Sequence, residues 1–165
     1  MTRRGRALAG WGAAQLALLV PLAAAERRMK ATGGPGIIPF ELAGPEHARR
    51  VLDGWGPSGR RAARVSLLLD YPFLVAYTGF NLALTTVAAE GLGGAGAGAV
   101  RAAQIAAAAC EAAENTALLG VLARDDDEVL PRVARAFARA KFALLGAGWA
   151  YAAAGLASRF ARSRR

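Results

Sequence analysis

The stretch from residue 99 to residue 123 constrains the fold more than any other part of the chain. It is apolar and long enough to cross a bilayer, yet Glu111, Glu114 and Asn115 lie near its middle. A charged side chain at the centre of a membrane costs about 2.5–3.5 kcal/mol on insertion scales, so it has to face protein or a water-filled cavity. The stretch therefore predicts a membrane helix that other helices shelter on one side.

Three further stretches have the length and apolar character of membrane spans: residues 7–25, 65–89 and 137–158. About 20 predominantly apolar residues are needed to cross the hydrocarbon core of a bilayer. The sequence therefore predicts an all-α, four-helix transmembrane bundle, with residues 1–165 forming one integral, multi-pass domain of the cell membrane. Pro72 predicts a kink in the second span near residues 68–70, because proline removes one backbone donor.

Residues 26–64 form a long first loop that we expect to be partly structured. Residues 37–43 are apolar but too short to span, and a short helix is expected over about residues 46–55. The residues Gly56 and Pro57 that follow predict its end. Val51, Leu52 and Trp55 are at helical spacing, which predicts a helix along the membrane interface with Trp55 as its anchor.

The N-terminal 25 residues allow a second interpretation. A basic start, an apolar stretch and the small residues 23–25 also fit a secretory signal with a cleavage site. The cations that follow directly, Arg27, Arg28 and Lys30, hinder export and favour a retained helix. The basic residues are more numerous around the first and third loops than near the termini, so the positive-inside rule leans toward loops inside the cell.

The net charge of +9 comes from basic residues that flank apolar blocks. This pattern favours contact with lipid headgroups over nucleic acid as a partner. The chain holds one cysteine, Cys110, and one histidine, His47, which excludes an internal disulfide and a multi-histidine metal site or bis-histidine haem within one chain. No cofactor can be named from the sequence, and no metal site is predicted.

Polar residues recur on one face of each of two spans. In the second span Asp70, Tyr77 and Asn81 are separated by seven and four residues, and in the third Glu111 and Asn115 by four, which places each set on one helix face. The first span has a weaker face of this kind with Gln15 and Glu26, and three such faces predict a common polar interior.

Counting residues outward from the turns estimates the depth of each side chain. Tyr77 and Glu111 should lie level across the second turn, and Glu114 and Lys141 across the third. We therefore predict an ion pair or charge-assisted hydrogen bond between Glu114 and Lys141. Glu41 has two interpretations: a surface residue, or a residue tucked into the mouth of the bundle. The predicted ligand-binding residues are Asp70, Tyr77, Asn81, Glu111, Glu114, Asn115 and Lys141.

The segments GPGIIPFELA, LDYPFLVAYTGFNLAL and CEAAENTALL, with the four spans, resemble small bacterial four-span integral membrane proteins of uncharacterised function. The resemblance extends over most of the chain. It implies a helix bundle in a bacterial membrane and brings no activity, cofactor or site residue with it.

Three classes of function fit these observations. The polar interior could bind a small ion, a proton or a lipid-like ligand. The same carboxylates could instead serve as acid and base in a membrane enzyme that acts on a lipid-soluble substrate. The third class is a structural accessory subunit whose small-residue helix faces dock on a membrane-protein partner.

Overall fold

The computed structural model describes residues 2–124 and 126–164, and these residues form helices and no strand. The all-α fold predicted from the sequence is confirmed. The helices are longer than the predicted spans, since each also includes polar residues that flank the apolar block. The elements are α1 (Arg3–Lys30), α2 (Ile37–Glu41), α3 (Pro45–Gly91), α4 (Ala97–Ala123) and α5 (Val129–Ser163).

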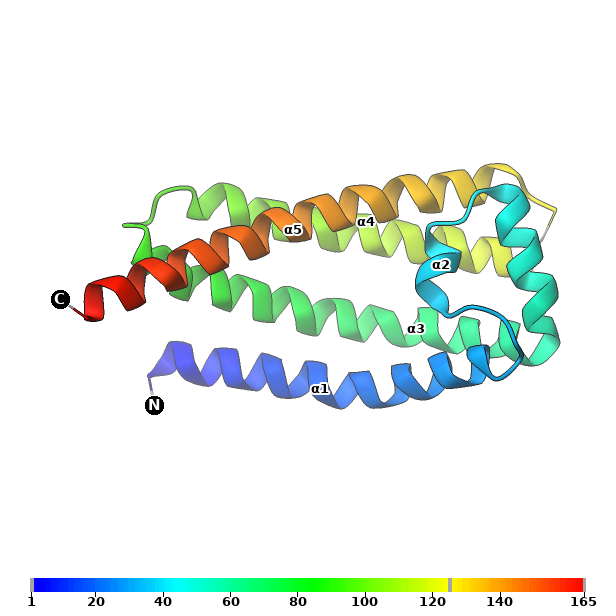
Figure 1. Ribbon diagram of the computed structural model, residues 1–165, viewed down its shortest axis with the longest axis horizontal. Helices are drawn as coiled ribbons and strands as arrows, with labels where there is room; N and C mark the ends of the chain where they lie inside the picture. The colour runs from blue at the N-terminus through cyan, green and yellow to red at the C-terminus, as the bar shows by residue number, and fades with distance from the viewer. Residues whose placement is uncertain (1, 125, 165) are drawn as a thin grey trace.

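The four long helices lie side by side and run antiparallel to their neighbours in sequence, so both ends of the chain lie at the same end of the bundle (Figure 1). α1 packs along α3, and α4 packs along α5, with α3 in contact with both α4 and α5. α2 and the first turns of α3 lie at the end opposite the termini (Figure 1).

A break at Gly56 divides α3 into two arms. Gly56 has φ 55° and ψ −167°, in a region that a residue with a Cβ rarely adopts, and Pro57 then starts the second arm. The sequence prediction of a helix ending at these two residues is confirmed. The backbone of α3 keeps helical dihedrals at Pro72 and departs from them at Gly56, and the kink near residues 68–70 stays a prediction.

The first arm of α3 faces inward. Trp55 is 1% exposed, its indole N–H donates to the Pro35 carbonyl oxygen (2.7 Å), and its ring lies 4.9 Å from that of Phe40. Met29 and Leu52 complete this core, which extends to Leu118 of α4. The prediction of Trp55 as an interface anchor is therefore wrong: the first loop folds back and closes one end of the bundle.

Among the residues that the structure describes, three helices, rather than the four predicted, are long and apolar enough to cross a membrane: α1, α3 and α4. α5 forms as predicted, but Lys141 and Arg159 bracket its uncharged stretch, residues 142–158. That stretch is 17 residues long, so any longer window for a membrane crossing has to include one of these two charges. By composition alone α5 is therefore a less apolar helix than the other three.

Small residues let α5 approach α3 closely. Ala152 is buried, and a Cβ added to Gly155 would overlap the carbonyl oxygen of Ala88 in α3. A Cβ on Gly91 would in turn overlap the Gly155 carbonyl oxygen. The backbones of the two helices therefore touch at this point, as small residues permit in membrane helices.

We expect Gly155→Ala to destabilise the bundle by about 1–3 kcal/mol, the usual cost of overpacking a filled site. The matched control is Gly146→Ala in the same helix, where an added Cβ meets no atom within 4 Å. Its stability should stay the same or rise, because alanine favours helix over glycine. Thermal unfolding in mild detergent measures both, and equal melting temperatures for the two variants would contradict the close approach.

Candidate functional site

The centre of the bundle holds a lysine surrounded by carboxylates. Lys141 of α5 is 3% exposed, and its Nζ lies 2.9 Å from Glu114 Oε2, 3.2 Å from Glu111 Oε1 and 3.4 Å from Glu41 Oε2. The predicted pairing of Glu114 with Lys141 is confirmed. The ammonium group also contacts two carboxylates whose pairing with it the sequence did not predict. We call these four residues the lysine cluster.

Helix geometry brings the lysine cluster together. Glu111 and Glu114 are three residues apart on α4, so they lie one turn apart on the same side of that helix. α5 packs along α4, and its residue Lys141 is about as far from the intervening turn as Glu114 is. A long side chain at that depth therefore ends between the two carboxylates.

Two hydrogen bonds join α3 to this site. Tyr77 donates its hydroxyl to Glu111 Oε2 (2.5 Å), and Asn115 donates an amide N–H to Asp70 Oδ2 (2.7 Å). The predicted alignment of Tyr77 with Glu111 is therefore confirmed. Asp70 also interacts electrostatically with Glu111 and with Lys141.

Asn81 lies on the same face of α3 but serves a different contact. Its amide donates to Gln104 Oε1 (3.0 Å), and Gln104 donates in turn to the Leu144 carbonyl oxygen (3.4 Å). These bonds connect α3, α4 and α5 toward the end of the bundle where the termini lie. Lys141 and the other five predicted site residues thus gather in one place, whereas Asn81 bonds to a separate pair.

Glu41 belongs to the site but was not among the predicted ligand-binding residues. It is the last residue of α2 and is buried, so the second interpretation of this residue, in the mouth of the bundle, is the one found. Glu26 of α1 accepts a hydrogen bond from the Ile37 backbone N–H (3.0 Å) and thereby holds the start of α2. The available signal was a lone carboxylate inside the short apolar segment PFELA.

Carboxyl groups outnumber cationic groups in this interior. Three glutamates share the single ammonium of Lys141, and Asp70 adds a fourth carboxyl group. Glu114 is 0% exposed, and its Oε1 has no hydrogen-bond partner within the described residues. An unsatisfied buried polar atom is costly, so Glu114 Oε1 adds to the energetic cost of this cluster.

A cavity of about 600 Å³ adjoins the lysine cluster. Its wall is mostly apolar, and its polar residues include Asp70, Glu111, Asn115 and Lys141 together with Glu26, Glu41 and Ser66. Leu19, Ile38 and Phe142 line this cavity and are also 44%, 56% and 43% exposed, so the cavity wall reaches the side of the bundle. The remaining lining residues are Leu22, Ala23, Ile37, Leu67 and Phe73.

A second cavity, of about 420 Å³, lies on the other side of the pair formed by Glu111 and Lys141. Both residues line both cavities, together with Phe73 and Phe142. Gln15, Asn81 and Trp149 lie in the second cavity. The charged pair therefore separates two spaces along the bundle. Within the described residues, histidine, cysteine and carboxylate side chains form no group that could hold a metal ion.

We expect Lys141→Met to destabilise the bundle by about 3–5 kcal/mol, because it leaves buried carboxylates without their cation. Arg139→Met, an exposed basic position two residues earlier on the same helix, is the matched control and should have little effect. The double variant Lys141→Met with Glu114→Gln should recover part of the loss. Thermal unfolding in detergent measures all three, and an unchanged melting temperature for Lys141→Met would refute the pairing.

Comparison of this chain with protein-family models, with curated proteins and with solved structures found no match. The resemblance to small bacterial membrane proteins therefore remains an expectation from the sequence. What the protein does has to be argued from the lysine cluster and the two cavities beside it.

Proposed function

We propose that this protein is a multi-pass membrane protein, a four-helix transmembrane bundle, that binds a lipid-soluble ligand. The ligand's polar head would lie against the lysine cluster, and its apolar part would fill the cavity of about 600 Å³. The observation that carries the proposal is the composition of that cavity: an apolar wall with charged and amide groups gathered at one place. Ligand sites commonly combine these two features.

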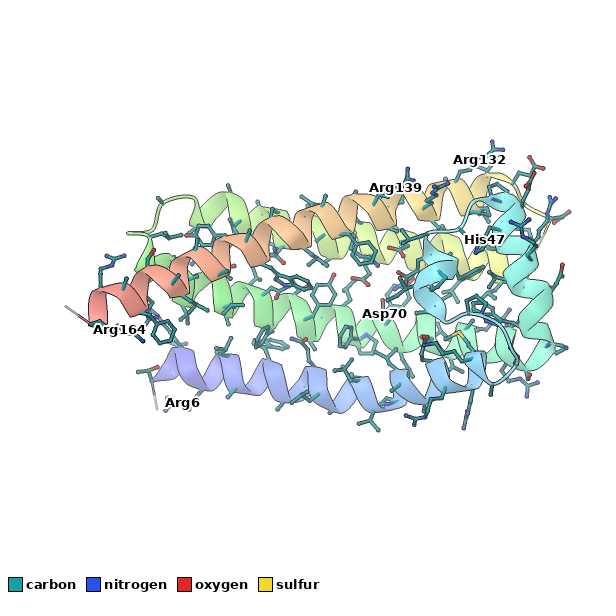
Figure 2. All side chains as sticks on the ribbon, in the orientation of Figure 1. Arg6, His47, Asp70, Arg132, Arg139 and Arg164 are labelled. Carbon is teal, nitrogen blue, oxygen red and sulfur yellow. The ribbon has the colours of Figure 1, made fainter. Side chains whose placement is uncertain are left out.

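The surface of the bundle supports a place in the membrane. No residue of the most apolar stretch of α1 is buried within the protein, and Leu16 and Val20 are 67% and 69% exposed. Large exposed apolar patches of this kind mark contact with a membrane or a partner. Arg6 and Arg164 lie at one end of the bundle and His47 and Arg132 at the other (Figure 2). Basic groups at both ends fit two headgroup layers.

The same reasoning extends to α5 as the fourth span. Its residues Phe142 and Trp149 are exposed on the outside of the bundle, as lipid-facing side chains would be. Its one charge in this region, Lys141, is directed inward and paired, which removes the main cost of placing it at membrane depth.

In membrane vesicles we expect the protein to stay in the pellet after washing with high salt and with alkaline carbonate. Its exposed apolar helix faces would otherwise meet water, and lipid contact removes that cost. A peripheral protein stripped by the same wash is the control. Recovery of the chain in the supernatant would contradict the membrane proposal.

The cavity proposal predicts that Leu22→Trp reduces the amount of lipid-soluble compound that co-purifies with the protein. Leu22 lines the cavity, and an indole at this position would fill part of it. Leu16→Trp on the same helix is the matched control, because Leu16 is 67% exposed and lies outside both cavities' linings. Native mass spectrometry of protein released from nanodiscs measures the bound compound.

The expected result is a bound species on the wild type and on Leu16→Trp that is lost from Leu22→Trp. If Leu22→Trp retains the same species at the same occupancy, the ligand lies elsewhere and the proposed site is wrong. Melting temperatures of the two variants, measured in parallel, separate a filled cavity from a misfolded bundle.

A further inference from the structure

We infer that the ligand's polar head is a cation, a protonated amine or a quaternary ammonium group, attached to an apolar chain. This inference rests on the proposed function and names the chemical class of ligand for the same cavity. It comes from the charges at the polar part of the cavity wall and from the way in which Lys141 is already occupied.

The lysine of the cluster has little capacity left for an anionic ligand. An ammonium group has three donors, and Lys141 Nζ already has carboxylate oxygens of Glu41, Glu111 and Glu114 within 3.4 Å. A fatty-acid carboxylate entering the cavity would have to displace one of these and would meet the others as like charges. Like charges brought together in a low-dielectric interior repel strongly.

Acidic groups, in contrast, have unused capacity on the cavity side. Asp70 and Glu111 both line the cavity, while Glu114 lies behind them and lines neither cavity. Asp70 is hydrogen-bonded to the neutral Asn115 amide and lies beside the Glu111 carboxyl group, and Lys141 interacts with it electrostatically. A cationic head beside Asp70 and Glu111 would add a second positive group to a site that has four carboxyl groups and one ammonium group.

An uncharged head, such as an alcohol, could also make hydrogen bonds to these groups but would leave the excess of acidic groups unchanged. The cation is therefore preferred by charge complementarity, and the apolar wall requires that it carry a chain. The volume of about 600 Å³ falls within the range of sites for drug-sized ligands.

The test compares three probes that share a twelve-carbon chain and differ in the head: dodecylamine, dodecanol and dodecanoate. Radiolabelled probes are added to the full chain in nanodiscs of zwitterionic phosphatidylcholine at neutral pH, where the amine is protonated. Binding to Leu22→Trp in matched nanodiscs is subtracted as the background of probe dissolved in lipid. Saturable dodecylamine binding should be about tenfold tighter than dodecanol binding, the size of one charge-assisted hydrogen bond.

A second comparison assigns the head to its acidic partner. Asp70→Asn keeps the shape of the side chain and removes its charge, so dodecylamine affinity should fall by about tenfold or more while dodecanol affinity stays the same. Asp126→Asn, on an exposed turn, is the matched control and should change neither affinity. The comparison of probes on the wild type does not depend on whether Asp70→Asn folds.

Each outcome decides the inference. Dodecanol or dodecanoate binding as tightly as dodecylamine, still blocked by Leu22→Trp, would overturn the cationic head and leave the cavity proposal standing. Absence of saturable binding for all three probes would also overturn the cationic head. The proposed function would then be judged separately, by the co-purified compound on the wild type and its loss from Leu22→Trp.

Discussion

The contact of one ammonium group with several carboxylates inside the bundle is the interaction on which the rest of the structure depends. Lys141 reaches Glu111 and Glu114 only because α4 and α5 pack along each other, and Glu41 only because α2 folds over the bundle. Charged groups at this depth have to be paired, since a lone ion there would cost several kcal/mol. The packing of α4 on α5, the path of the first loop and the depth of Lys141 in the bundle therefore depend on one another.

Buried ion pairs are a poor source of stability, because desolvation cancels much of the Coulomb attraction. These ion pairs lie where four helices meet, beside two cavities. A role in ligand binding explains this position better than a contribution to folding stability does. Tyr77 and Asn115 add fixed hydrogen bonds that hold the Glu111 and Asp70 carboxyl groups in place. In the proposed function, this rigid polar wall would orient the head of a ligand whose chain lies in the apolar part of the cavity.

Much of this arrangement could be predicted because an α-helix has a fixed number of residues per turn and a fixed rise per residue. The spacing of Asp70, Tyr77 and Asn81 gave one face of α3, and equal distances from the turns paired Glu114 with Lys141. The position of Glu41 could not be predicted, because it depends on how a loop with several glycines and prolines folds back. Trp55 was misassigned for the same reason: its helix was predicted correctly, but the surface it packs against is set by tertiary contacts. Cavities depend on side-chain packing between helices and have no signal in a single sequence.

The arm of α3 before Gly56 packs with Phe40 and Trp55 into a filled core at one end of the bundle, while the wall of the adjoining cavity reaches the outside at Leu19, Ile38 and Phe142. In a bilayer, a ligand would then enter the cavity laterally, from among the lipid acyl chains. Its occupancy would follow its mole fraction in the surrounding leaflet and not its solubility in the aqueous phase. Membrane composition would thus control how often the protein is loaded.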